Sequence, residues 1–258
     1  MKNNKADKFL KLIEILKELR SPDGCDWDKE QTHESLTPYL LEEVYEVIEA
    51  IENKDYSLLK EELGDLLLHI IFQADLAEEK NKFSIEDALE SINDKLVRRH
   101  PHIFLDKSDK KWTTGNWEYA KQKEKNRDSI IEGVPKSLPA LLRARRIQEK
   151  AASVGFDWNN HNQVLEKIDE EINELKKALI QNKGIEDELG DVLFTIVNLS
   201  RHLKIDPEKS LRFSIEKFSK RFKKIEKDLD SEQININDLS LEELDRIWEK
   251  NKINLNNK

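Results

Sequence analysis

The same short motifs occur twice along the chain, in the same order. The segment GCDW at residues 24–27 returns as GFDW at 155–158, and ELGD at 62–65 returns at 188–191. In each half an EExxE pattern precedes ELGD, and a KxxxR pattern follows it. A repeat of this kind indicates one supersecondary unit used twice. Any fold assigned to one half must therefore serve the other half as well.

Helical periodicity dominates both halves. Apolar residues recur at three- and four-residue spacing, and only 7 of the 258 residues are glycine, fewer than a turn-rich β fold uses. The sequence therefore predicts an all-α protein made of two tandem copies of a helical-bundle unit. The expected N-terminal domain spans residues 1–105, and the expected C-terminal domain spans 137–258. A Lys-rich linker at 106–136, with a short helix near 116–126, separates them. Helices are predicted at residues 5–20, 36–53, 56–80, 84–99, 138–151, 162–182, 184–203, 207–229 and 240–252.

Charge and apolar content exclude several classes of protein. With 44 Lys+Arg against 53 Asp+Glu, the net charge is −9, and no basic stripe typical of a nucleic-acid binder is present. The longest apolar stretch, Leu66–Phe72, is interrupted by His69 and is too short to cross a bilayer. A single cysteine, Cys25, cannot form an internal disulfide, which fits a reducing compartment. The amphipathic, charged N-terminus is unlike the apolar core of a signal peptide. We therefore expect a cytoplasmic protein that binds neither nucleic acid nor membrane.

The repeated carboxylates point to a metal site. Glu171 and Glu174 share one helix face, and so do Glu188 and Asp191 on the next helix. A short connection near residues 182–184 should pack these helices antiparallel and bring the four carboxylates together. Like charges that meet in this way need a cation, and oxygen-only ligation suits Mg²⁺, with Mn²⁺ as the alternative.

Each motif also has an ordinary structural explanation. In so acidic a chain, a single EExxE pattern is expected by chance and would form a solvated helix face. Chance does not explain why the pattern is followed by ELGD in both halves. Glycine inside an apolar helix costs about 1 kcal/mol relative to alanine, so Gly64 and Gly190 indicate a close helix approach or room for a ligand. In the repeated motifs the residue three positions after the glutamate is Asp or Glu, never the His of the ExxH motif in di-iron bundles. His69, matched by Thr195, is interpreted as a packed histidine.

Basic and aromatic residues also repeat. Lys217 and Arg221 share a helix face, which would let them hold phosphate oxygens beside an acidic metal cluster. Trp248 and Lys252 offer a ring for base stacking and a further phosphate donor. Surface charge and a core tryptophan are the competing interpretations. The first half carries Lys95 with Arg99, and then Trp117 with Lys121, in the same order.

With these motifs in view, the chain resembles the MazG family of nucleoside triphosphate pyrophosphohydrolases. The resemblance runs from about residue 9 to 252 and rests on GCDWDKEQT, PYLLEEVYEVIEAI, EELGDLLLHIIFQA, RRHPHIF and LPALLRARRIQEKAASVGFDW. It implies an all-α, Mg²⁺-dependent homodimer that cleaves NTPs or dNTPs to the monophosphate and pyrophosphate. It also implies a house-cleaning role in the nucleotide pool.

The resemblance also implies roles for particular residues, mainly in the C-terminal unit. The implied catalytic and metal-binding set is Glu170, Glu171, Glu174, Glu188 and Asp191, and the implied nucleotide-binding set is Lys217, Arg221, Trp248 and Lys252. The N-terminal unit retains a second set, whose activity the sequence leaves open: Glu42, Glu43, Glu46, Glu62, Asp65, Lys95 and Arg99.

The same sequence features are compatible with two other functions. The chain would also fit a related pyrophosphohydrolase that acts on one nucleotide, such as phosphoribosyl-ATP. From a different class, a non-catalytic helical module would use the acidic faces to dock a regulatory protein partner. If the chain is such a module, we expect that Mg²⁺ with nucleotide does not stabilise it in a melting assay.

Overall fold

The computed structural model describes residues 4–104, 124–125 and 127–256, and every regular element within these ranges is a helix. The chain divides into two compact units, Met1–Lys110 and Lys111–Lys258. The helix predicted near 116–126 lies almost entirely outside the described residues, and so do Trp117 and Lys121. Within the described ranges, no helix has both the length and the apolar character needed to cross a membrane.

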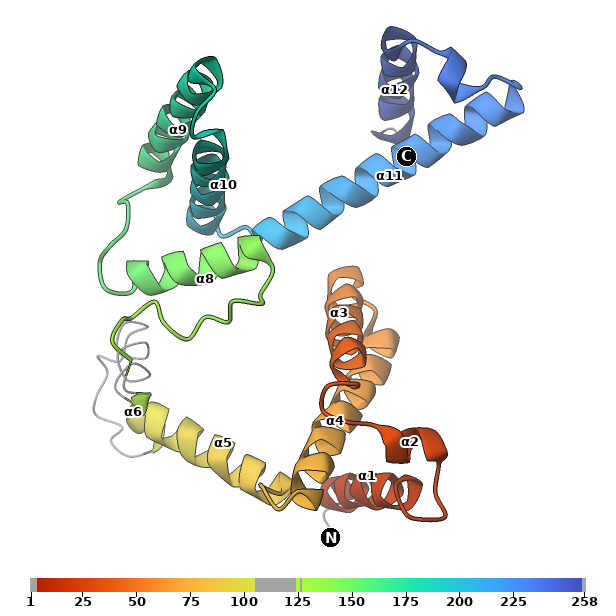
Figure 1. Cartoon of the computed structure of the whole chain (residues 1–258), viewed down its shortest axis with the longest axis vertical. Helices are drawn as coiled ribbons and strands as arrows, with labels where there is room; N and C mark the ends of the chain where they lie inside the picture. Colours follow the sequence, from red (N-terminus) through yellow and green to blue (C-terminus); the bar gives the residue numbers. More distant parts are fainter. Residues whose placement is uncertain (1–3, 105–123, 126, 257–258) are drawn as a thin grey trace. The chain divides into compact units, whose positions relative to one another are not determined.

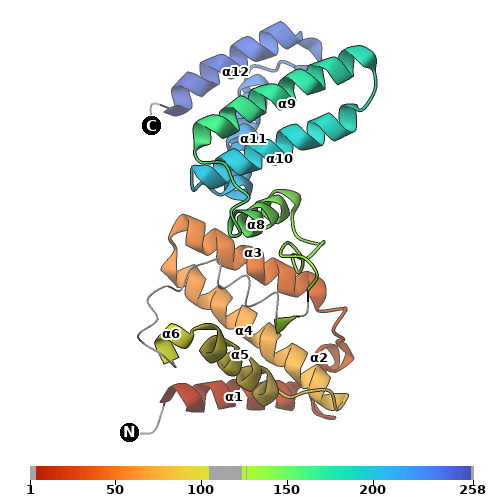
Figure 2. The ribbon, with the colours of Figure 1, turned by 90° about the vertical axis from the view of Figure 1, so that its left-hand side faces the viewer.

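The first unit is built on an antiparallel pair of helices, α3 and α4, which pack side by side (Figures 1 and 2). Helix α1 lies against α4 and closes the core. This core is formed by Leu16, Leu36, Ile71, Phe72 and Leu76, all of them buried. The helices of this unit are α1 (Asn4–Leu19), α2 (Asp26–Glu30), α3 (Thr37–Asn53), α4 (Tyr56–Glu79), α5 (Ile85–Arg99) and α6 (Pro101–Phe104).

The second unit repeats the helix pair with α9 and α10, and α8 packs across α10 as α1 packs across α4 (Figure 2). Val164 and Val197 are fully buried in this unit, and Ile225 and Leu229 bury one face of the long helix α11. The helices are α8 (Ala140–Ala152), α9 (His161–Gln181), α10 (Ile185–His202), α11 (Pro207–Ser231) and α12 (Leu241–Asn256), with a short 3-10 helix, η1 (Ile236–Asp238), before α12.

Local signals explain where the helices begin and end. Ser84 and Asp87 form a reciprocal capping box at the start of α5. Each helix pair turns through a left-handed residue, Lys54 (φ 57°) after α3 and Asn182 (φ 49°) after α9. These turns explain why the predicted boundaries agree with the structure to within a few residues. The short helices α2, α6 and η1 were not predicted, because so few residues give no periodic pattern.

Both helix pairs leave an apolar stripe in solvent. On α10, Leu189, Leu193 and Ile196 recur at four- and three-residue spacing, and each is between 45% and 49% exposed. Leu63 and Ile70 occupy the matching positions on α4, and each is 50% exposed. The repetition of this stripe in both units indicates a shared feature of the surface rather than scattered apolar residues.

Candidate metal and nucleotide site

Three of the four predicted carboxylates in the second unit converge. Glu171 and Glu174 on α9 and Glu188 on α10 each present an oxygen, and these oxygens lie within 4.8 Å of one another. Glu171 is buried and the other two are half-buried. Asp191 is exposed and lies at the edge of this group, close enough to raise the pKa of Glu188.

The first unit builds the corresponding cluster. Oxygens of Glu43 on α3 and of Glu62 and Asp65 on α4 lie within 4.8 Å of one another. Glu46 lies close enough to this group to raise the pKa of both Glu43 and Glu62. Glu42 is exposed on the neighbouring face of α3. The antiparallel packing predicted from the sequence therefore brings carboxylates together in both units.

The electrostatics of both clusters favour a bound cation. Desolvation and then the neighbouring carboxylates raise the pKa of Glu188, with Glu174 as the strongest neighbour. The same causes raise the pKa of Glu62 and Glu43 in the first unit. Crowded carboxylates in a partly dry position hold protons more tightly unless a positive charge neutralises them. An all-oxygen donor set of this density fits a hard divalent cation.

A lysine that the sequence analysis missed lies at the second cluster. Lys167 Nζ is 2.7 Å from Glu171 Oε1 and 2.9 Å from Glu170 Oε1. These hydrogen bonds, the one to Glu171 first, raise the pKa of Lys167 well above its usual value. The signal was present in the sequence, since Lys167 precedes the two glutamates by three and four residues. Glu170 is thus directed to Lys167 rather than into the cluster, and its side chain is more than half exposed.

The two ELGD glycines face open space. A Cβ placed on either Gly64 or Gly190 would meet no atom within 4 Å outside its own helix. Of the two explanations offered by the sequence, a close helix approach within the unit is therefore wrong. The surface at both positions is free for a ligand or a second chain to approach.

Two of the three predicted nucleotide-binding cations, Lys217 and Arg221, lie on the long helix α11. Lys217 is exposed, and Arg221 is buried with its guanidinium carbon 5.8 Å from the centre of the Trp248 ring. That ring also packs against Phe218, with their centres 5.0 Å apart. The structure thus brings Arg221 of α11 together with Trp248 of α12, and α11 leads away from the α9–α10 pair (Figure 1). Lys252 belongs to α12, but its side chain lies outside the described part of the chain.

The basic pair of the first unit differs in burial from Lys217 and Arg221 of the second unit. Lys95 and Arg99 lie one turn apart on α5, and both are half-buried.

His69 on α4 is buried, and burial lowers its pKa, as expected of a packed histidine. Thr195, its counterpart on α10, is buried as well.

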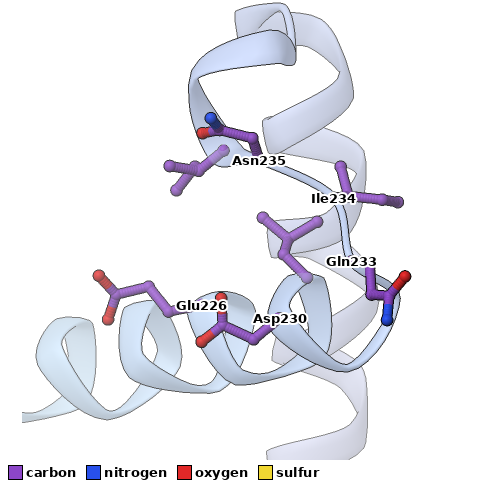
Figure 3. A pocket seen from close by; sticks show the side chains of 7 residues that line it. Glu226, Asp230, Gln233, Ile234 and Asn235 are labelled. Atoms are coloured by element: carbon purple, nitrogen blue, oxygen red, sulfur yellow. The ribbon is translucent and has the colours of Figure 1, made fainter.

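A separate hollow of about 560 Å³ lies where α11 ends and the chain turns toward η1 (Figure 3). Glu226 and Asp230 stand on α11, and Gln233, Ile234 and Asn235 line the turn. Both carboxylates are exposed and belong to one helix, which is the arrangement of an ordinary solvated surface. No ligand is assigned to this hollow.

Comparison with known proteins identifies relatives over nearly the whole chain. The model of the MazG nucleotide pyrophosphohydrolase domain matches twice, at residues 31–104 and 159–225. The chain is 49% identical over 246 residues to the nucleoside triphosphate pyrophosphohydrolase/pyrophosphatase MazG of Thermotoga maritima, and the match covers 95% of each chain. It is 40% identical to the nucleoside triphosphate pyrophosphohydrolase of Escherichia coli K12, over 94% of this chain and 96% of that protein. The uncharacterized protein YabN of Bacillus subtilis is 42% identical over 92% of this chain, which corresponds to 50% of YabN.

Proposed function

The chain belongs to the MazG family of nucleotide pyrophosphohydrolases, and we propose that it hydrolyses nucleoside triphosphates, NTPs or dNTPs, to the monophosphate and pyrophosphate. The observation that carries this proposal is the carboxylate cluster of the second unit, with Glu171, Glu174 and Glu188 within 4.8 Å. Relatives whose names state this activity match over almost the full length of the chain. The proposed cellular role is house-cleaning of the nucleotide pool.

Mg²⁺ is the cofactor that the donor set fits best, with Mn²⁺ as an alternative. Glu171, Glu174 and Glu188 would hold it, with Asp191 at the edge of the cluster and Glu170 available once Lys167 releases it. When bound, Mg²⁺ supplies a Lewis acid that polarises phosphate oxygens and lowers the pKa of water. The raised pKa of Glu188 supports this assignment, because a cation would remove the cause of the shift.

The basic residues are proposed to bind the phosphates of the nucleotide. Lys167 already lies at the cluster and would be released toward the triphosphate when a cation takes its place on Glu171. Arg221 can bind phosphate oxygens bidentately, and Lys217 can act as a point charge. Trp248 and Lys252 complete the proposed nucleotide-binding set. Neutralising the leaving pyrophosphate in this way stabilises the charge that develops as the anhydride bond breaks.

The first unit is proposed as a second metal site. Its carboxylate oxygens lie within 4.8 Å of one another, as in the second unit, and crowding and desolvation raise the pKa of Glu43 and Glu62. The residues proposed for it are Glu42, Glu43, Glu46, Glu62 and Asp65, with Lys95 and Arg99 as its cations.

A homodimer is proposed as the working form. The support is the exposed apolar stripe on α10, formed by Leu189, Leu193 and Ile196, and its counterpart on α4. Such a stripe is normally covered by another chain. The open surface at Gly190 lies on the same helix and would allow a second copy to pack closely.

Pyrophosphate release tests the proposal. The protein is incubated with each NTP and dNTP in the presence of Mg²⁺, and pyrophosphate and orthophosphate are measured separately. Glu174→Gln with Asp191→Asn should abolish pyrophosphate release if the second unit carries the chemistry. Glu46→Gln with Asp65→Asn measures the share of the first unit.

A matched control keeps the total charge change the same. Glu166→Gln with Glu186→Gln removes two exposed carboxylates from the same helices, outside the cluster, and should leave turnover unchanged. Release of orthophosphate alone, or full activity in both cluster variants, would refute the proposal. Turnover of a single metabolite such as phosphoribosyl-ATP would assign the chain to a specific rather than a general pyrophosphohydrolase.

A further inference from the structure

A largely apolar pocket of about 510 Å³ lies in the second unit, between α8, the GFDW segment and α10. Phe156, Trp158 and Phe194 contribute aromatic rings to its lining, and Ala151 lies on the α8 side. Its volume is within the range of about 300–1,000 Å³ that small-molecule sites occupy. The carboxylate cluster does not line it.

In the first unit, larger side chains occupy the positions that correspond to two residues of the pocket lining. The motif register matches Arg20 with Ala151 and Phe72 with Asn198. In the first unit, the Arg20 side chain is 5% exposed, and its guanidinium lies 5.0 Å from the centre of the Phe72 ring. Two large side chains are thus replaced by two small ones in the second unit. Both smaller side chains, Ala151 and Asn198, line the pocket.

One buried polar atom in the pocket lining lacks a partner. Gln148 is 7% exposed, and its Nε2 donates a 2.8 Å hydrogen bond to the carbonyl oxygen of Phe194. This bond fixes the orientation of the amide, because only the nitrogen can donate to a carbonyl. The Oε1 atom is left buried without a hydrogen-bond donor. An unsatisfied buried acceptor is unfavourable unless a ligand or water supplies the donor.

The charged groups at the rim are already paired. Arg201 Nη1 donates a 2.9 Å hydrogen bond to Asp157 Oδ2, and its Nε donates to Asn198 Oδ1. Burial alone would raise the pKa of Asp157, but the bonds from Arg201 and His202 outweigh it and keep that pKa below its usual value. The rim therefore offers no free charge for an anion, and what the pocket requires is a flat apolar body with a hydrogen-bond donor.

We propose that this pocket binds a planar heteroaromatic ring with an N–H donor, namely a nucleobase, between the rings of Phe156, Trp158 and Phe194, with its N–H on Gln148 Oε1. Aromatic walls stack on the face of any base, and the amide oxygen reads a donor on its edge. Two sources of the ring share this chemistry. It belongs either to the substrate nucleotide or to a free nucleoside bound independently of turnover. In the first case the inference rests on the proposed function, and Trp248, whose ring packs against Arg221 and Phe218, supports the phosphate-binding arginine instead of stacking on the base.

Binding is measured first, without catalysis. Adenosine, guanosine, cytidine and uridine are titrated into the full-length protein in EDTA, with isothermal titration calorimetry and tryptophan fluorescence as readouts. Nucleosides carry no phosphate, so binding does not depend on the metal cluster. At least one nucleoside should bind saturably. Ala151→Phe, which fills the pocket, should weaken binding at least tenfold.

Gln148→Leu removes the acceptor and keeps the size of the side chain. It should weaken binding by roughly three- to tenfold, the effect of losing one neutral hydrogen bond. Ala140→Phe places the same ring on the exposed first residue of α8, outside the pocket, and should bind as the unmodified protein does. Circular dichroism verifies that each variant is folded, and the leucine variant decides the matter if the phenylalanine variant does not fold.

A second arm identifies the source of the ring. If the base belongs to the substrate, Ala151→Phe raises KM for NTPs while inhibition by inorganic tripolyphosphate is unchanged. If a free nucleoside is the ligand, KM is unchanged and nucleoside still binds in the presence of saturating tripolyphosphate and Mg²⁺. Either result supports the pocket. The inference is overturned if no nucleoside binds the unmodified protein, or if both variants bind as it does, whether or not the protein hydrolyses NTPs.

Discussion

Replacing Lys167 by methionine should strengthen Mg²⁺ binding to the second unit. Lys167 Nζ lies 2.7 Å from Glu171 Oε1, and the Glu171 side chain is only 7% exposed. A cation that binds Glu171 has to displace this ammonium group first. The first unit has Tyr39 at the matching position, three residues before the EExxE motif, and so lacks this competitor.

The structure sets the size of the effect. A hydrogen bond to a charged group contributes about 1.5–3 kcal/mol. The Lys167 side chain is 32% exposed, so the lower end of this range applies. Removing the competitor should therefore tighten Mg²⁺ binding by about tenfold, since about 1.4 kcal/mol corresponds to a factor of ten. The metal-free protein should lose a similar amount of stability, because Glu171 would stay buried without its partner.

Calorimetric titration with Mg²⁺ measures this directly. Glu46→Gln with Asp65→Asn in every sample restricts the signal to the second unit. Lys177→Met removes an exposed lysine from the same helix and should leave the affinity unchanged. Lys167→Met should also raise KM for NTPs, since the released lysine is proposed to bind phosphate. Unchanged or weaker Mg²⁺ binding in Lys167→Met would refute the reasoning.

Three further predictions concern pH, the core of the first unit and assembly. Because the pKa values of Glu62 and Glu188 are raised from 4.5, the folded state binds more protons than the unfolded state just above that pH. Without Mg²⁺, the free energy of unfolding measured in urea should therefore fall as the pH rises from 4.5 through the raised pKa values. Mg²⁺ binds the deprotonated carboxylates, so at saturating Mg²⁺ the free energy of unfolding should instead rise over the same pH range. Arg20→Ala should lower the free energy of unfolding by about 3–5 kcal/mol, because Asp75, 11% exposed, loses its buried partner 2.8 Å away; a loss below about 1 kcal/mol in chemical denaturation would mean that the pair is screened as on a surface. Leu193→Glu on the exposed stripe should leave the helices intact by circular dichroism and yield monomers in sedimentation velocity, and an unaffected dimer would place the interface elsewhere.

The sequence predicts the long helices well because their signals are local. Periodic apolar residues, the Ser84–Asp87 capping box and the turn at Asn182 each act within a few residues of where they stand. The convergence of carboxylates follows from the same locality, because carboxylates three residues apart share a helix face and a short turn folds the two helices side by side, although Asp191 stays at the edge of the group. The repeat adds certainty, because one arrangement has to satisfy both copies.

Other features depend on distant packing and escape such reasoning. The sequence around Ala151 does not predict a pocket, because the pocket is lined jointly by Ala151 on α8 and by Asn198 on α10. The burial of Arg221 against Trp248 likewise joins two helices. Lys167 is a different case, since its spacing to the glutamates was visible, but surface lysines with that spacing are common and rarely decide a site.

The two units share their carboxylates and differ in what surrounds them. In the first unit Tyr39 packs edge-on against Trp27, with ring centres 5.9 Å apart, and Arg20 fills the space between α1 and α4. In the second unit the same two places hold a displaceable lysine and an open pocket. A donor set that occurs twice cannot by itself assign catalysis to one copy. The surroundings differ, because among the described residues only the second cluster has a lysine on its buried glutamate, and an open pocket is found elsewhere in the same unit.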